Sequence, residues 1–91
     1  MNVGILANPH KPGSLPTLQA LRVALAANGV DSILEEQTAL LARENGGIPA
    51  ADFARHVDLA AVIGGDGTML HALSLIGDFN HPVAGINVGT L

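Results

Sequence analysis

The chain has 91 residues, of which 48% are hydrophobic, 13% are charged and 2% are aromatic, so it is expected to fold as one domain with an aliphatic core. It contains no cysteine, which excludes disulfides and thiolate metal sites, and its four Lys and Arg residues with a net charge of −4 exclude a basic surface for nucleic acid. No apolar run is long enough to cross a bilayer and no basic signal-peptide start is present, so we expect a cytoplasmic protein without a membrane partner.

Short apolar runs alternate with helical stretches along the chain, which predicts a parallel sheet with crossover helices. Residues 2–7 (NVGILA) are predicted as the first strand, and a turn-rich loop follows over residues 8–13. Ser14 is predicted to cap the next helix, which ends at Asn28-Gly29. Four leucines at helical spacing should face the sheet: Leu15, Leu18, Leu21 and Leu25.

The middle of the chain is less regular. Residues 30–34 are predicted as a second strand with Glu35 and Glu36 at its end, and residues 37–44 as a weaker helix. Adjacent residues point apart on a strand or a helix, so these two carboxylates are not expected to share acid–base work. Residues 48–56 have an ambiguous pattern and are expected to form a loop with a turn of helix.

The last part of the chain contains the clearest strand, residues 58–63 (DLAAVI), which runs into the glycine-rich string of residues 64–68. A helix closed by Gly77 is predicted next, and residues 82–87 (PVAGIN) are predicted as a fourth strand. One apolar face of that helix is expected to contain Met69, Ala72, Leu73 and Ile76. These elements predict one α/β domain over residues 1–91, doubly wound, mostly parallel and Rossmann-like.

The string Gly64-Gly65-Asp66-Gly67-Thr68 lies between a strand and a helix, at the sheet edge where ligands collect. Glycines let a ligand approach the backbone, and N–H groups near a helix N-terminus bind anions such as phosphate. Asp66 can accept a proton from a ligand hydroxyl, orient that hydroxyl, or help to hold a metal ion. The alternative is a purely structural role, in which the string forms a tight turn that caps the helix. The whole five-residue string, however, favours a functional site.

Known glycine-rich fingerprints fit this string poorly. A Walker A loop would continue with Gly-Lys-Ser or Gly-Lys-Thr, and the glycine spacing differs from that of a dinucleotide-binding fingerprint. The string resembles the GGDGT motif of NAD kinases, of diacylglycerol and sphingosine kinases and, in a near variant, of phosphofructokinases. Met69-Leu70 after the motif and the string Val88-Gly89-Thr90-Leu91 are similar to the NAD kinase pattern, whereas Leu91 departs from that of the lipid kinases.

The resemblance to NAD kinases implies phosphoryl transfer from ATP, or from polyphosphate, to the adenosine 2′-hydroxyl of NAD, assisted by Mg²⁺ or another divalent ion. Asp66 matches the catalytic aspartate of the family, and Gly64, Gly65, Gly67 and Thr68 are then expected to bind nucleotide. The full-length protein would have NAD and ATP as partners and form a homo-oligomer, a dimer or a tetramer. No metal ligand is predicted among the residues of this chain.

The family pattern also includes an Asn-Glu or Asn-Asp pair and an all-β C-terminal domain that complete the NAD site, and neither has a match here. The chain has no helix after its fourth strand to cover the sheet. We therefore expect an N-terminal nucleotide-handling domain of a two-domain kinase, ending at a cut, with little or no activity alone. A lipid kinase domain and a non-catalytic nucleotide-binding module remain open as alternatives.

Three further side chains are candidate ligand contacts. Lys11, in the loop after the first strand, lies where it can reach a phosphate, although exposed lysines often have no specific role. His71 lies one turn into the helix after the motif and is a second candidate, with packing as its alternative. His10 is a weaker candidate in the first loop, and the four histidines lack zinc-ligand spacing.

Overall fold

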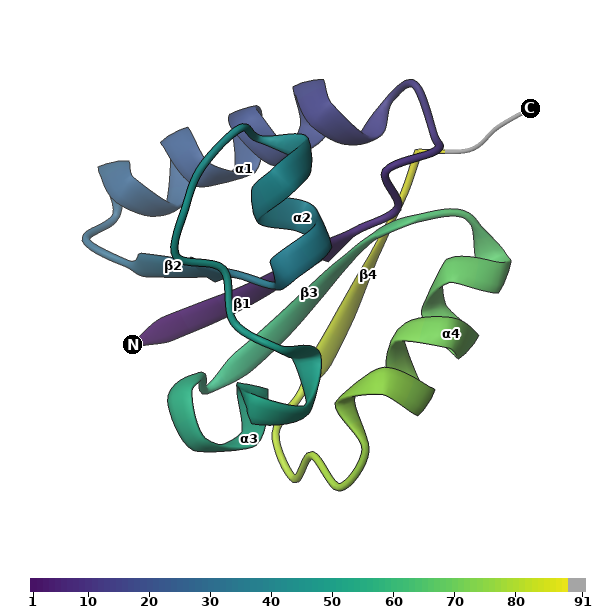
Figure 1. The fold of residues 1–91 in the computed structure, drawn as a ribbon. Coiled ribbons are helices and arrows are strands. Elements are labelled where there is room, and N and C mark those ends of the chain that lie inside the picture. Colours follow the sequence, from purple (N-terminus) through teal and green to yellow (C-terminus); the bar gives the residue numbers. More distant parts are fainter. Residues whose placement is uncertain (89–91) are drawn as a thin grey trace.

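The computed structural model describes residues 1–88 and contains a four-stranded parallel sheet with helices on both faces (Figure 1). The strands are β1 (Asn2–Ala7), β2 (Asp31–Leu34), β3 (Leu59–Gly64) and β4 (Val83–Asn87), in the order β2-β1-β3-β4. All three pairings are parallel, with Ile5 opposite Leu34 and Ala61, for example. The predicted doubly wound α/β fold and its four strands are confirmed.

The helices divide between the two faces of this sheet. α1 (Ser14–Ala27) and α2 (Glu36–Leu41) pack on one face. The short 3₁₀ turn η1 (Ala50–Asp52), α3 (Phe53–His56) and α4 (Asp66–Ile76) pack on the other. Because the strands are parallel, their carboxyl ends and the N-termini of α1, α2 and α4 meet at one edge of the sheet (Figure 1).

Two aliphatic cores follow from the alternation of side chains along the strands. On β1, Ile5 is fully buried against Leu18 of α1, while the neighbouring Leu6 belongs to the core beneath α4. Phe53, one of the two phenylalanines of the chain, is fully buried in that second core. The leucines predicted to face the sheet from α1 all contact the first core, which confirms that prediction.

The predicted cap of α1 is wrong by one residue. The helix begins at Ser14 itself and Gly13 is its cap, with no side-chain hydrogen bond. A capping side chain must lie just outside the helix to reach the free N–H groups of the first turn. Ser14 instead lies inside it, and its buried hydroxyl has no hydrogen-bond partner among the described residues.

The second helix also begins and ends earlier than predicted. Glu35 caps α2, since its carboxylate accepts hydrogen bonds from the backbone N–H groups of Gln37 at 2.9 Å and Thr38 at 3.1 Å. The helix ends at Leu41, and Arg43 then takes a positive φ of 57°. The predicted turn of helix within residues 48–56 is present as η1 and α3.

The apolar face of α4 differs from the prediction at Leu73, which is 45% exposed. The buried residues of this helix are Thr68, Ala72 and Ile76, each four positions apart. A spacing of four residues keeps side chains on one narrow stripe, and Leu73 lies about 100° around the helix from Ala72. Gly77 ends α4 as predicted. Of the string Val88-Gly89-Thr90-Leu91, the last three residues lie outside the described residues.

Arg22 of α1 and Glu44 form an exposed ion pair that predicts a small acid-dependent contribution to stability. The hydrogen bond from Arg22, and then its charge, lower the pKa of Glu44 below its ordinary value. The pair therefore stabilises the fold above the ordinary carboxyl pKa, and the contribution is lost as the pH falls through the lowered pKa. We expect Glu44→Gln to lower the urea midpoint slightly at pH 7 and to leave it unchanged in strong acid. An equal loss at both pH values would contradict the ion-pair explanation.

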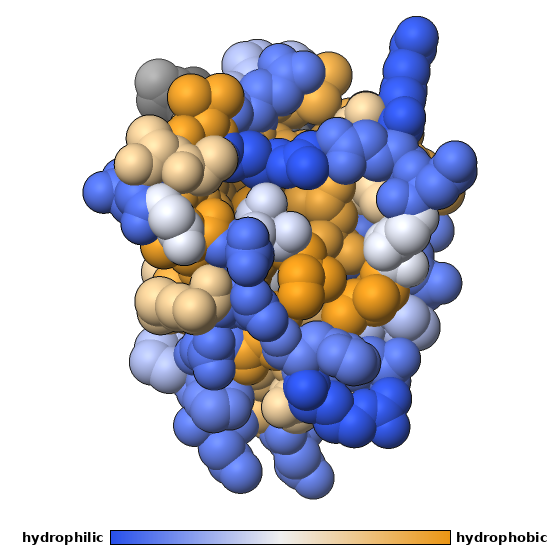
Figure 2. Space-filling view, turned by 90° about the vertical axis from the view of Figure 1, so that its left-hand side faces the viewer, coloured by the Kyte–Doolittle hydropathy of each residue, from blue (hydrophilic) through white to orange (hydrophobic). Residues whose placement is uncertain are grey.

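Figure 2 shows the side of the molecule that carries the N-terminus and β2. Most residues on this face are hydrophilic, and hydrophobic residues are visible between them in the middle of the face. Among residues 1–88, no helix is both long and apolar enough to span a bilayer.

Candidate active site

The motif of residues 64–68 lies where β3 ends and α4 begins. Gly64 is the last residue of the strand, Gly65 caps the helix in an extended conformation, and Asp66 is the first helical residue. The Asp66 side chain is exposed and makes no hydrogen bond or ion pair with any described residue. A carboxylate at this edge is therefore available to a ligand.

The loop after β1 is fastened to the motif through Asn8. Its backbone N–H donates to the Ile63 carbonyl at 2.9 Å, and its side-chain amide donates to Thr68 Oγ1 at 3.1 Å. The Asn8 carbonyl in turn accepts a hydrogen bond from the Lys11 N–H at 3.3 Å. Two chain segments 60 residues apart are thereby held together at the edge of the sheet.

Thr68 has a structural role at this junction that can be tested. Its buried hydroxyl oxygen accepts hydrogen bonds from Asn8 Nδ2 and, at 3.3 Å, from the Gly65 N–H. We expect Thr68→Val to destabilise the fold by roughly 1–3 kcal/mol, because two donors lose their acceptor. Thr68→Ser, which keeps the hydroxyl, should recover most of that loss. Urea unfolding of both variants measures it, and equal stabilities for Val and Ser would contradict this role.

Lys11 reaches over the motif from this fastened loop. A Cβ atom placed on Gly65 would lie 3.5 Å from Lys11 Cε and 3.7 Å from Lys11 Nζ. Lys11 forms no ion pair with any described residue, whereas Arg22 and Arg55 are paired with acidic residues elsewhere. The ammonium group therefore lies close to the backbone of Gly65 and forms no ion pair with a described residue.

Two pockets flank Asp66. The larger, of about 610 Å³, lies between the loop after β1, the start of α2 and the start of α4. We call it the lysine pocket. Its lining comprises Leu6, Ala7, Asn8, Pro9, His10, Lys11, Glu35, Gln37, Gly65, Asp66, Gly67, Thr68, His71 and Leu75.

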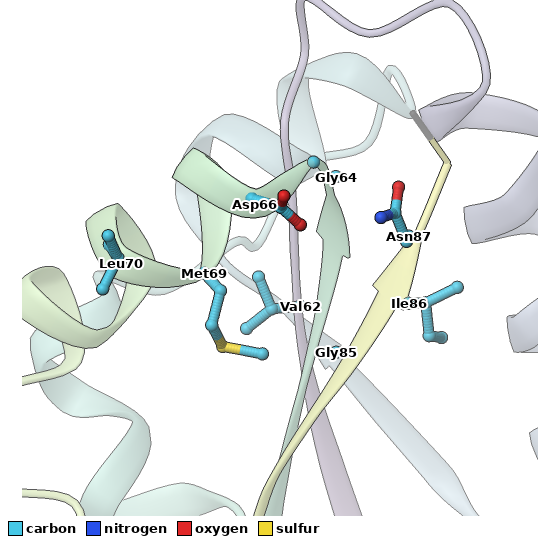
Figure 3. A pocket seen from close by; sticks show the side chains of 9 residues that line it. Val62, Gly64, Asp66, Met69, Leu70, Gly85, Ile86 and Asn87 are labelled. Atoms are coloured by element: carbon cyan, nitrogen blue, oxygen red, sulfur yellow. The ribbon is translucent and has the colours of Figure 1, made fainter. Parts of the chain in front are cut away.

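The second pocket, of about 420 Å³, lies between α4 and β4, and we call it the methionine pocket. Figure 3 shows the Asp66 carboxylate pointing from the start of α4 toward the ends of β3 and β4, with the Met69 side chain below it. The lining comprises Val62, Gly64, Gly65, Asp66, Met69, Leu70, Gly85, Ile86 and Asn87. Gly65 and Asp66 line both pockets, so Asp66 lies at the boundary between them.

The structure brings the sequence-predicted residues to one place. The lysine pocket contains Gly65, Asp66, Gly67, Thr68, Lys11, His71 and also His10, while Gly64 lines the methionine pocket. Sequence reasoning missed Asn8, Gln37 and Asn87. Asn8 and Asn87 each lie at the carboxyl end of a strand, a position that already marks ligand sites in parallel sheets.

No group of three or more metal-ligating side chains occurs within residues 1–88. A divalent ion would therefore need ligands beyond this part of the chain. Mg²⁺ commonly takes one or two protein carboxylates together with substrate phosphates and water, and Asp66 is a carboxylate suited to that role.

Known proteins share both the sequence and the fold. The NAD kinase of Shewanella sp. (strain MR-4) is 34% identical over 90 residues, which cover 98% of this chain and 29% of that protein. The NAD kinase of Salmonella dublin is 39% identical over 93 residues, covering 98% of this chain and 31% of that protein. The crystal structure of yeast NADH kinase complexed with NADH superposes with a TM-score of 0.78 at 25% identity, over all of this chain and 32% of that one.

This chain spans about a third of the length of these relatives. The relatives are named as NAD or NADH kinases, which does not favour the lipid kinase alternative. Residues 3–91 match the family described as the ATP-NAD kinase N-terminal domain. The chain therefore belongs to the ATP-NAD kinase N-terminal domain family.

Proposed function

We propose that this chain supplies the nucleotide-handling part of an NAD kinase, which transfers a phosphoryl group from ATP, or from polyphosphate, to the adenosine 2′-hydroxyl of NAD. The observation that carries the proposal is the position of Asp66, an exposed and unpaired carboxylate between two pockets at the start of α4. Family membership and the relatives' names support NAD as the acceptor.

In the proposed reaction, Asp66 orients the 2′-hydroxyl and receives its proton. The bond between the γ-phosphorus and the β–γ bridging oxygen of ATP breaks as the bond from phosphorus to the 2′-oxygen forms, and ADP leaves. A carboxylate is a weak base, but the transition state of phosphoryl transfer is loose, so that positioning and charge stabilisation supply most of the catalysis. Late proton transfer to Asp66 is sufficient in such a mechanism.

The remaining motif residues serve the phosphates. The N–H groups at the start of α4, beside Gly65 and Gly67, bear the positive end of the helix dipole, which favours anions. Lys11 and His71 add contacts from the loop after β1 and from the second turn of α4. A divalent ion bound with the donor phosphates would supply further countercharge.

The complete kinase is proposed to act in the cytoplasm as a homo-oligomer. The matched 90 residues cover 29% of the Shewanella relative, and the methionine pocket is open to solvent at the exposed Leu70. We therefore expect this chain alone to turn over NAD slowly or not at all.

A hybrid protein tests the proposal. The chain is joined to the C-terminal part of the Shewanella NAD kinase that follows the matched region, and the hybrid and the chain alone receive NAD, ATP and Mg²⁺. NADP is measured with a dehydrogenase that accepts only NADP. We expect the hybrid to form NADP and the chain alone to form little. A folded hybrid that binds NAD but forms no NADP would contradict the proposed function.

A further inference from the structure

We propose that Thr38 and Glu35, at the start of α2, are positioning residues for the phosphoryl transfer: they hold the end of β1 and so place Lys11 beside the motif. This role rests on the proposed kinase function and extends it to two side chains outside the glycine-rich string. Thr38 is fully buried, so it can act only through the residues that it contacts.

The Thr38 hydroxyl continues the hydrogen bonding of the sheet where β2 has ended. The pairing of β1 with β2 stops at Ile5, and the Ala7 N–H donates instead to Thr38 Oγ1 at 2.8 Å, in a buried place. The next N–H group, that of Asn8, donates to the Ile63 carbonyl of β3 at 2.9 Å. The chain is thereby held from both sides at the point where it leaves the sheet.

Glu35 fixes the direction of the Thr38 hydroxyl. Its Oε1 accepts hydrogen bonds from the Thr38 hydroxyl at 2.9 Å and from the Thr38 N–H at 3.1 Å, while its Oε2 accepts from the Gln37 N–H at 2.9 Å. A backbone N–H can only donate and a carboxylate can only accept, so the hydroxyl donates to Glu35 and accepts from Ala7. One ordered chain of hydrogen bonds therefore joins α2 to the end of β1.

The position of Lys11 depends on this exit point. The Lys11 N–H donates to the Asn8 carbonyl at 3.3 Å, and the Lys11 carbonyl accepts from the Ser14 N–H at 3.0 Å, so the loop is folded back on itself. A displacement at its start is then carried to Lys11, whose Nζ lies 3.7 Å from the place of a Cβ atom on Gly65. A misplacement of about 1 Å in an active site can cost about a hundredfold in rate.

Kinetics of the hybrid kinase test the role. Thr38→Val removes the hydroxyl at nearly constant volume, and we expect kcat/KM for ATP to fall about tenfold while KM for NAD changes less than about twofold. Thr38→Ser keeps the hydroxyl and should recover most of the loss. Glu35→Gln should cause a smaller loss, because its one oxygen can still accept from Thr38 while its amide group faces the Gln37 N–H.

A control variant separates positioning from stability. Val57 is 3% exposed and lies just before β3, at the end of the sheet away from the motif. Val57→Ala should lower the urea midpoint through lost core contacts and leave kcat/KM for ATP unchanged.

A second comparison asks whether Thr38 acts through Lys11. If it does, Thr38→Val should reduce kcat/KM for ATP by less than about twofold further in a chain that already carries Lys11→Gln. A purely structural role of Thr38 would give the full loss in that background as well.

Hydrogen exchange of the 91-residue chain, followed by amide NMR, tests the structural step without a substrate. In Thr38→Val the Ala7 amide should exchange at least about tenfold faster than in the wild type, relative to the Ile5 amide. The amide resonances of Asn8 and Lys11 should shift in Thr38→Val and return in Thr38→Ser.

Other outcomes overturn the role. An unchanged Ala7 exchange rate, equal kinetic losses in Thr38→Val and Val57→Ala, or a full further loss in the Lys11→Gln background would each remove Thr38 as a positioning residue and leave the proposed function standing. If Thr38→Val does not fold, Glu35→Gln serves in the same comparisons. A folded wild-type hybrid that forms no NADP would remove the proposed function, and this role with it.

Discussion

Asp66→Asn in the hybrid kinase is expected to lower kcat by about 10²–10⁴-fold, the range typical of a lost general base. The amide occupies nearly the same volume but cannot take up the proton of the 2′-hydroxyl. Asp66 makes no hydrogen bond or ion pair with described residues, so the substitution should leave the fold and both dissociation constants nearly unchanged. Steady-state kinetics and calorimetric titration with NAD and an ATP analogue measure the two effects separately.

Asp78→Asn is a suitable control for the lost charge, because Asp78 is exposed just after α4 and lines neither pocket. It should keep wild-type kcat. If Asp66→Asn kept more than about a tenth of the wild-type kcat, Asp66 would not act as the base. If it abolished binding together with turnover, its role would be to hold a ligand or a metal ion.

Gly64→Ala is expected to destabilise the chain by roughly 2–3 kcal/mol through overpacking. A Cβ atom on Gly64 would lie 2.3 Å from Thr68 Oγ1 and 2.6 Å from Thr68 Cβ, and Thr68 is a stiff, buried side chain in the first turn of α4. The helix would have to shift away from β3. Urea unfolding at pH 7 measures the change.

Gly67→Ala is the matched control within the same motif. Its Cβ atom would meet nothing within 4 Å, and its φ is not positive, so the substitution should stabilise the helix by about 0.5–1 kcal/mol. Any loss of nucleotide affinity in this variant would then reflect crowding of a ligand rather than of the fold. Equal stabilities of the two alanine variants would refute the packing explanation for Gly64.

The strands and the location of the motif could be predicted because their signals are local. Buried parallel strands appear as short apolar runs, and residues 58–63 followed by a glycine string mark a strand that meets a helix. The carboxyl ends of the strands in a parallel sheet lie at one edge, so the sequence alone predicted that Lys11 and the motif would lie near each other.

Other features depend on contacts that no local pattern encodes. The cap of α2 by Glu35 requires the side chain to fold back over Gln37 and Thr38, and a pair of acidic residues does not reveal which of them will do so. The exposure of Leu73 depends on how α4 rotates against β3. The division of the site into two pockets arises from the placement of α4 between the first loop and β4, which is a tertiary property.

The most direct test of the central claim is a competition between acceptors. The hybrid kinase receives Mg²⁺, ATP labelled in the γ-phosphate, NAD, and vesicles that contain diacylglycerol, and the labelled products are separated. We expect label in the 2′-phosphate of NADP, formed in step with ADP and lost in Asp66→Asn. Label transferred to the lipid, or released as free phosphate without NADP, would contradict it.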